Sequence, residues 1–428
     1  MSAQPIVTQI GQNMRLLRIQ CDNTKTTCLS VALQMPLRKN TAEHLLLSSF
    51  LSHTSKTYPT LAKLSAQLEE LYGAILSVDT RKLGESYCLR FSITCLKDSL
   101  ALKGESLSKA ALQLLLDLLL NPKAQNGAFD AKQFATEQRI CIADLESILN
   151  DKRAYALGRL VEIMCQNEAY GLSHTALLEE MKAVTPERLY TAWQTLLREA
   201  VVSITVVGDE DFSEIEKLLQ ARFAALPDRK PQSTVTLYKT EVEAVKEVEE
   251  EMDVSQSKLC LGFRTAMQDK NDRYFAHRVL ADLFGGGPYS RLFTYVREKK
   301  SLCYYCSARL DRLKGILFVQ SGIEQANKAA AQAEILKQLD VLRRGEFSDE
   351  ELAASKAALC DLFRGIEDTT ESLDAFYAFK TEGTVHTPAH FIKGIEAVTR
   401  ADVIAAAKGV RLDTVYLLTG KEATVCPN

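Results

Sequence analysis

The strongest constraint on the fold is an internal duplication of the 428-residue chain. Residues 181–187 read Met-Lys-Ala-Val-Thr-Pro-Glu, and a helical stretch then leads to the apolar run 201–208, which ends at a glycine. Residues 395–401 read Ile-Glu-Ala-Val-Thr-Arg-Ala and lead in the same way to 414–420. The two Ala-Val-Thr triplets lie 214 residues apart, and the two terminal glycines lie 212 apart. Two matching features at nearly one offset indicate two similar halves.

Each half mixes strands with long helices. Residues 72–93 and 304–323 alternate apolar and polar side chains around a central glycine, which is typical of two strands joined by a turn. Long helical patterns begin after Phe129 in the first half and after Phe347 in the second. Hairpins and helix pairs without regular βαβ alternation indicate the α+β class.

The duplication also predicts the domain organisation, since 428 residues are too many for one hydrophobic core. We expect an N-terminal half at 1–225, a proline-bearing linker at 226–233 and a C-terminal half at 234–428. The segment 234–254 alternates valine with glutamate and lysine, so we expect a solvated edge strand there.

Composition excludes several classes of function. Lysine and arginine number 52 against 55 aspartates and glutamates, a net charge of −3, which argues against an electrostatic nucleic-acid binder. The most apolar stretch, 111–120, is half of the roughly 20 residues that a membrane span needs. The N-terminus lacks the pattern of a signal peptide. We therefore expect a soluble, cytoplasmic protein whose eleven cysteines are mostly reduced.

Candidate chemistry concentrates in residues 283–304. The glycine triplet there lacks the Lys-Ser/Thr continuation of a phosphate-binding loop, so we expect it to end one helix and to allow close approach of the next, at 290–299. Arg297 lies near the end of that second helix, and Tyr304 follows seven residues later. A guanidinium and a phenol held close together could bind a carbonyl oxygen or an oxyanion. The alternative is that both residues are purely structural.

The only closely spaced cysteine pair in the sequence is Cys303-Tyr-Tyr-Cys306. One C-x-x-C pair has no second pair to complete a tetrahedral metal site. The alternatives are a redox role and two cysteines packed in a short strand.

The stretch 285–304, G-G-G-P-Y-S-R-L-F-T-Y-V-R-E-K-K-S-L-C-Y, resembles the second-half signature of the pitrilysin and mitochondrial-processing-peptidase family of inverzincin zinc metallopeptidases. That signature reads G-G-G-x-x-S-R-L-F-x-x-x-R-E-x-x-x-L-x-Y. The resemblance implies two duplicated α/β-sandwich halves of the LuxS and processing-peptidase type. It also implies that Arg297 and Tyr304 bind substrate and stabilise the oxyanion at a zinc site in a facing half or partner chain.

The first-half signature of that family, H-x-x-E-H on a helix, is absent from this chain. Alignment through the Tyr-Pro dipeptide at 58–59 places the two histidine ligands on Leu45 and Ser49 and the glutamate base on Ser48. The distal glutamate ligand would fall near Asp144, in the helix expected at 137–146. Because leucine cannot bind zinc and serine is a poor ligand, we expect no metal in this chain.

Other histidines are weak substitutes for those ligands. His44 and His53 are nine residues apart and do not share a helix face as i and i+4 ligands would. His386 and His390 have the i, i+4 spacing, but the proline between them disfavours a helix interior.

The resemblance implies a non-catalytic subunit that pairs with a homologous zinc-bearing chain and acts on a peptide or protein substrate, with a homodimer in isolation as a further state. Within the family the chain most resembles the YfmF/YmfF-like bacterial branch, which is named for an association with 5-aminopentanol modification of elongation factor P. Two alternatives stay open. One is a structural assembly protein without a role in proteolysis, and the other is a self-sufficient peptidase that uses unrecognised residues.

Overall fold

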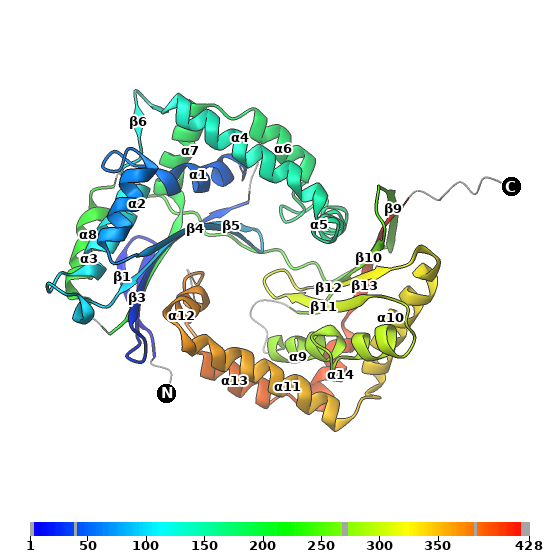
Figure 1. Cartoon of the computed structure of the whole chain (residues 1–428). Coiled ribbons are helices and arrows are strands. Elements are labelled where there is room, and N and C mark those ends of the chain that lie inside the picture. Colours follow the sequence, from blue (N-terminus) through cyan, green and yellow to red (C-terminus); the bar gives the residue numbers. More distant parts are fainter. Residues whose placement is uncertain are drawn as a thin grey trace. The chain divides into compact units, whose positions relative to one another are not determined.

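A computed structural model gives the fold of the chain (Figure 1). It describes residues 4–37, 41–209, 211–226, 228–267, 273–380 and 383–420. Residue 227, within the expected linker, therefore lies outside the described residues. The chain divides into two compact units, each assembled from three stretches of sequence. Unit 1 consists of Met1–Glu146, Thr175–Val235 and Arg364–Ala389, and unit 2 of Ser147–His174, Thr236–Phe363 and His390–Asn428.

The sheet of unit 1 has six strands that run antiparallel to their neighbours, except that β2 and β8 are parallel. From edge to edge they are β1 (Ile6–Gly11), β2 (Met14–Gln20), β8 (Val201–Gly208), β3 (Thr26–Pro36), β5 (Ser86–Leu96) and β4 (Ile75–Leu83). All residues of β8 are buried. Full burial and a nearly continuous apolar sequence are typical of a strand covered on both faces.

Within the described part of the chain, eight α-helices belong to unit 1, and several of them cover its sheet. They are α1 (Thr41–His53), α2 (Leu61–Glu70), α3 (Leu107–Leu120), α4 (Ala131–Ser147), α6 (His174–Lys182), α7 (Pro186–Glu199), α8 (Ser213–Ala224) and α12 (Thr370–Tyr377). The repeated Ala-Val-Thr motif starts α7, because the Thr185 side chain accepts a hydrogen bond from the backbone of Arg188 and Pro186 occupies the first turn. The helix-then-strand reading of this repeat is confirmed.

The sheet of unit 2 has five strands, of which only β13 and β9 run parallel. In spatial order they are β11 (Tyr305–Asp311), β12 (Ile316–Ile323), β10 (Ser257–Arg264), β13 (Arg411–Thr419) and β9 (Lys246–Glu251). The expected hairpins are confirmed as β4–β5 and β11–β12. The expected edge strand is confirmed only over β9, since 234–245 forms no strand.

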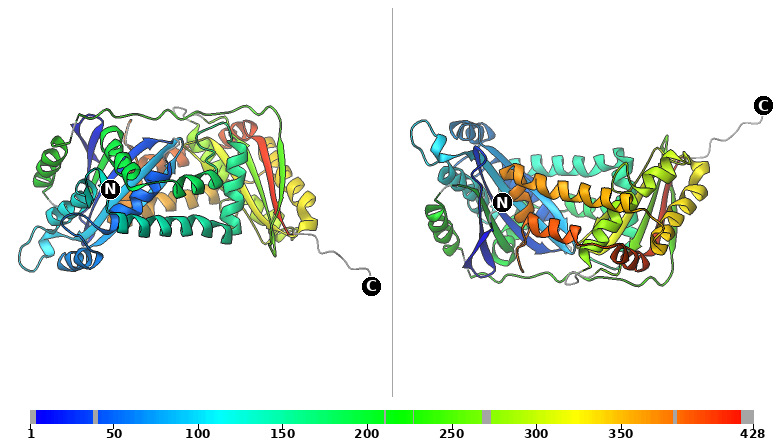
Figure 2. Two further views of the ribbon diagram at one scale, coloured as in Figure 1. Left: turned by 90° about the horizontal axis from the view of Figure 1, so that it is seen from above. Right: turned by 90° about the horizontal axis from the view of Figure 1, so that it is seen from below.

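The helices of unit 2 are α5 (Lys152–Met164), α9 (Tyr274–Gly285), α10 (Lys328–Arg344), α11 (Asp349–Arg364), α13 (Pro388–Glu396) and α14 (Arg400–Lys408). The second copy of the repeat starts α14, where Thr399 and Asp402 form a capping box. Figure 2 shows each sheet and its helices from two further sides. Among the described residues, none of the helices combines the length and the apolar character that crossing a bilayer requires.

One face of each sheet is covered by a segment that comes from the other half of the sequence. In unit 2 this segment carries α5, whose Leu160 and Met164 pack against Phe318 and Tyr416 of the sheet. In unit 1 it carries α12, whose Leu373 and Tyr377 pack against Leu17, Cys28 and Val207. Because burial of apolar area is the main stabilising contribution, each sheet depends on a distant part of the chain.

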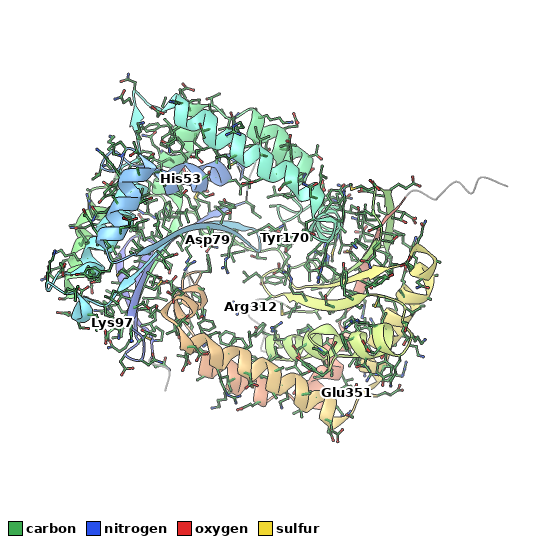
Figure 3. All side chains as sticks on the ribbon, in the orientation of Figure 1. His53, Asp79, Lys97, Tyr170, Arg312 and Glu351 are labelled. Atoms are coloured by element: carbon green, nitrogen blue, oxygen red, sulfur yellow. The ribbon has the colours of Figure 1, made fainter. Side chains whose placement is uncertain are left out.

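Buried ion pairs hold both segments. In unit 1, Asp374 is fully buried, accepts a hydrogen bond from Ser30 at 2.5 Å and pairs with Arg90. In unit 2, Glu168 pairs with the fully buried Arg264 at 2.6 Å and Lys314 at 2.7 Å. Figure 3 marks Tyr170 in this second segment, where its hydroxyl donates to Asp311.

The expected halves at 1–225 and 234–428 describe the repeat in the sequence, and that division stays a prediction. The compact units themselves are discontinuous.

Candidate functional site

The glycine triplet ends α9 and allows two segments to pack closely. A Cβ atom on Gly285 would lie 2.4 Å from the backbone nitrogen of Ala308 in β11 and 3.0 Å from a methyl group of Leu292. Glycine is therefore required where α9 meets both the following helical turn and the strand. The expected end of the helix is confirmed, and the close approach is to the strand as well as to the next helix.

That next helix differs from the expected regular helix over 290–299. Leu292–Glu298 forms a π-helical turn, in which the backbone N–H of Lys299 donates to the carbonyl of Thr294 five residues earlier at 3.0 Å. The side chains of Leu292 and Val296 are fully buried and anchor the turn. π-helical turns are rare and are found often at functional sites.

Arg297 is on the exposed side of this turn. Its side chain is 42% exposed, its guanidinium carbon lies 4.7 Å from the centre of the Phe293 ring, and its Nε lies 3.6 Å from the Glu298 carboxylate. Stacking on an aromatic ring limits the positions that a long side chain can take, and an exposed ion pair contributes little to stability. The guanidinium therefore keeps hydrogen-bond donors directed to solvent.

Tyr304 precedes β11 and is also exposed, at 58%. Its backbone N–H donates to the carbonyl of Gly322 at 2.8 Å, and its hydroxyl donates to the carboxylate of Glu324. The hydrogen bond and the negative charge of Glu324 raise the pKa of Tyr304 above its usual value. The phenol is therefore a protonated donor at neutral pH.

Arg297 and Tyr304 line the same surface hollow, with a volume of about 420 Å³. The backbone reverses between them at Ser301, which has the left-handed φ of 52° that costs a non-glycine residue about 1 kcal/mol or more. The residues around the hollow are Arg297, Glu298, Ser301, Leu302, Cys303, Tyr304, Glu324 and Asn327. The two donors singled out in the sequence thus come together at one site within unit 2, and neither is sealed in the core.

The positions aligned with the zinc motif lie in unit 1. Leu45, Ser48 and Ser49 are half-buried on α1, and Asp144 is exposed on α4. The hydroxyl of Ser48 donates to the carbonyl of Leu45 at 2.6 Å, within its own helix. The hydroxyl of Ser49 donates to the carboxylate of Glu137 on α4 at 2.5 Å.

Glu137 joins this group to His53, which Figure 3 marks at the C-terminal end of α1. The His53 Nδ1 lies 2.9 Å from the Glu137 carboxylate, and this hydrogen bond raises the pKa of His53 against the opposing effect of burial. Burial alone would raise the pKa of Glu137, but hydrogen bonds from His53 and Ser49 bring it below its usual value. A serine, a carboxylate and a histidine therefore satisfy one another beside the positions that the sequence aligns with the zinc ligands.

These residues do not fit a zinc ion. Leucine has no donor atom, and a neutral serine hydroxyl is a poor ligand. Within the described ranges, histidine, cysteine, aspartate and glutamate side chains form no group of three or more that could hold a metal. Nothing in this region supports a step through bound zinc.

The other candidate histidines have ordinary surroundings. His44 is buried and stacks on Tyr87 with 5.5 Å between ring centres, and burial lowers its pKa to about 4. His390 is exposed and packs beside Phe275, while the backbone carbonyl of His386 accepts a hydrogen bond from Lys380. The i, i+4 spacing of the last pair creates no metal-binding group in the part of the chain that is described.

Sequence reasoning missed two carboxylates. Glu137 lies two helical turns before Asp144, so a search along that helix face could have found it. Glu324 becomes visible only from the register of the β11–β12 hairpin, which pairs Tyr305 with Gly322.

The chain is similar to one family model and to a protein of known description. Residues 183–359 match the family model described as the peptidase M16 inactive domain. A Bacillus subtilis protein described as the probable inactive metalloprotease YmfF is 32% identical over 406 residues, which cover 94% of this chain and 95% of that protein.

Solved structures agree on the fold. A conserved protein of Enterococcus faecalis superposes with a TM-score of 0.90 at 28% identity, covering 99% of this chain and 100% of the other. A Helicobacter pylori protease superposes with a TM-score of 0.83 at 14% identity, covering 97% and 99%. The expected α+β fold of the processing-peptidase type and the resemblance to an inactive branch are confirmed.

Proposed function

Because this chain belongs to the M16 peptidase family and lacks the family's zinc-binding residues, we propose that it is the non-catalytic subunit of a heterodimeric zinc peptidase. Its partner is a homologous chain that carries H-x-x-E-H and supplies the zinc, the base and the attacking water. This chain supplies Arg297 and Tyr304 to a peptide or protein substrate held at the partner's zinc. Cytoplasmic localisation belongs to the same proposal.

One observation carries the proposal. Arg297 and Tyr304 line a single hollow as exposed donors, although the zinc positions in the same chain have lost their ligands. A purely structural pair would be expected to be buried with its hydrogen bonds satisfied inside the protein. A guanidinium and a protonated phenol are suited to a carbonyl oxygen that gains negative charge during peptide hydrolysis.

Glu324 has a defined place in this proposal. The Tyr304 hydroxyl has one proton and donates it to Glu324 in the unbound chain. A substrate carbonyl must therefore compete with Glu324 for that proton. Replacement of Glu324 by Gln removes the negative charge that competes for this proton. We expect this variant to lower the KM of the pair and to change its kcat less.

Co-expression with the zinc-bearing homologue of the same organism tests the proposal. We expect the two chains to co-purify and peptidase turnover to require both. Arg297→Ala or Tyr304→Phe should lower the turnover of the pair by about 10²-fold, the usual effect of removing one oxyanion donor. Arg344→Ala is the matched control, because that arginine pairs with Glu346 at an exposed helix end outside the hollow.

Unchanged turnover in both variants would contradict the proposal and would favour the structural assembly protein. Stoichiometric zinc in the isolated chain would instead favour a self-sufficient peptidase. Sedimentation of the isolated chain shows whether it forms a homodimer when no partner is present.

A further inference from the structure

The hollow contains a second chemical group that the proposed function does not use. Cys303 lines the hollow immediately before Tyr304 and is half-buried. Cys306 lies three residues later in β11 and is buried, with 5% of its surface exposed. One thiol is therefore partly accessible from solvent, and the other is nearly inaccessible.

The two thiols are close to each other. Their side chains are close enough to influence each other's pKa, although residues three apart in a fully extended strand would lie about 10 Å apart. The backbone bends at Tyr304 before β11 begins, and this bend brings the two side chains together. Both thiols also lie near the hydroxyl of Ser321, the residue paired with Cys306 across the hairpin.

The surroundings give the two thiols different reactivities. The hydrogen bond from Cys306 lowers the pKa of Cys303 to about 7, aided by Ser321 and the positive charge of Arg297 and opposed by burial. The same hydrogen bond, with burial, holds the pKa of Cys306 well above its usual value. An accessible thiolate beside a protonated buried thiol is the arrangement of an attacking and a resolving cysteine.

We propose that Cys303 and Cys306 form a hydroperoxide-sensitive dithiol pair in the wall of the hollow, with Cys303 as the attacking thiol and Cys306 as the resolving thiol. This inference concerns the isolated chain and does not depend on the partner subunit proposed above.

The chemistry balances in two steps. The Cys303 thiolate attacks one oxygen of hydrogen peroxide, the O–O bond breaks, and hydroxide leaves while the sulfur becomes a sulfenic acid. The Cys306 sulfur then attacks the Cys303 sulfur, the S–O bond breaks, and the hydroxyl group leaves as water with the proton of Cys306. Two thiols lose two electrons, and one peroxide is reduced to the level of water. Small thiols reverse the change by thiol–disulfide exchange.

The disulfide would act directly on the proposed substrate-binding group. It would close a short loop that contains Tyr304 and Tyr305, and it would fix the backbone on both sides of Tyr304. We therefore expect oxidation to move the phenol relative to Glu324 and Arg297 and to alter the hollow.

Peptide mapping of the native full-length chain tests the proposal. Trypsin cleaves after Lys300 and Arg309, so both cysteines fall in one peptide, 301–309. After brief treatment with a small excess of hydrogen peroxide at pH 7, this peptide should lose the mass of two hydrogens and resist alkylation. Dithiothreitol should restore it. The proposal is overturned if 301–309 stays reduced while other cysteine peptides are oxidised.

Cys141 is the matched control, because it is also half-buried but burial raises its pKa to about 11. Four pKa units change the thiolate fraction by nearly 10⁴, and the lower nucleophilicity of the more acidic thiol offsets about 10² of that difference. Iodoacetamide should thus modify Cys303 on the order of 50-fold faster than Cys141 at pH 7. Equal rates would overturn the assignment of Cys303 as the attacking thiol.

Two variants separate the roles of the thiols. In Cys306→Ala, peroxide should leave a sulfenic acid on Cys303 that dimedone traps, because no resolving thiol is present. In Cys303→Ser, residue 306 should give neither the disulfide nor a dimedone adduct. A dimedone adduct on Cys306 in that variant would overturn the order of the two steps. The mapping of the unaltered chain stands even if a variant fails to fold.

Discussion

Helix α1 in unit 1 and the segment 285–304 in unit 2 hold the positions that the sequence aligns with the two signatures of the family, yet they differ in what their side chains contact. On α1, Ser48 bonds to its own helix and Ser49 bonds to Glu137, so the polar groups are satisfied internally. In the second segment, Arg297 and Tyr304 line an open hollow. Where the zinc motif is missing, the polar groups of the helix therefore satisfy one another within unit 1, while the two candidate donors of unit 2 remain exposed.

Restoring the missing zinc motif on α1 and α4 should have the largest effect. Leu45→His, Ser48→Glu, Ser49→His and Asp144→Glu together recreate the ligands and the base on α1 and α4. We expect the purified variant to hold about one zinc per chain and the unaltered chain to hold none, as measured by metal analysis. The matched control keeps Leu45 and should lose most of the zinc. A folded four-residue variant without zinc would show that the backbone of this region has also diverged.

The second prediction compares the segments that complete each sheet. Asp374→Asn removes the buried carboxylate that pairs with Arg90, and Glu168→Gln removes the carboxylate that Arg264 and Lys314 share. Each variant should lower the free energy of unfolding by about 3 kcal/mol, because removing one partner of a buried ion pair is strongly destabilising. Urea denaturation measures this loss. Asp349→Asn removes an exposed pair with Arg400 and should cost less than about 0.5 kcal/mol. A similar small loss in all three variants would refute the role assigned to the buried pairs.

A smaller effect is expected at the turn between the two donors. Ser301→Val forces a β-branched residue into a left-handed conformation, and it should lower the free energy of unfolding by about 1–2 kcal/mol. Ser301→Gly should stay within about 0.5 kcal/mol of the unaltered chain, since relief of strain is offset by the entropy of the unfolded glycine. Ser307→Val in β11 is the control, because a strand accepts valine. Equal losses in the two valine variants would argue against strain at Ser301.

The smallest effect concerns pH and the satisfied network on α1. Since pairing raises the pKa of His53, its contribution is fully present below the unfolded value of about 6.5 and disappears as pH rises through the folded pKa. Since pairing lowers the pKa of Glu137, the pair also weakens as pH falls through that lower value. His53 is partly exposed, so His53→Gln should cost only about 0.5 kcal/mol at pH 6 and almost nothing at pH 9. Equal losses at both pH values would exclude the charged pair, and His386→Gln serves as the control.

The sequence predicted much of the local structure for clear physical reasons. Alternating side chains predicted both hairpins, and the repeated Ala-Val-Thr motif preceded two predicted helices. Thr185 and Thr399 of that motif cap these helices, and capping is a local interaction that a sequence motif can encode. The π-helical turn at 292–298 was not predicted. Leu292 and Val296 are four residues apart, and this spacing puts both side chains on one face of an α-helical or a π-helical turn.

The sequence predicted only the part of the candidate site that is local in the chain. Arg297 and Tyr304 lie close in the sequence, and a resemblance to a known signature drew attention to them. Glu324 contacts Tyr304, 20 positions away, and Glu137 contacts Ser49, 88 positions away. No local sequence pattern reveals contacts over such separations. Whether Arg297 and Tyr304 act on a substrate stays a prediction.

The interleaving of the two units bears on how this protein can be made and divided. The chain alternates between the units in six stretches, so a fragment that ends near residue 225 lacks the helix that carries Asp374. A fragment that starts near residue 234 lacks Glu168 and leaves Lys314 without that carboxylate. Expression of either half by itself should therefore give an aggregation-prone product, while the two halves supplied together could complement each other. Any ancestor of half this length would have needed a second copy to complete its sheets.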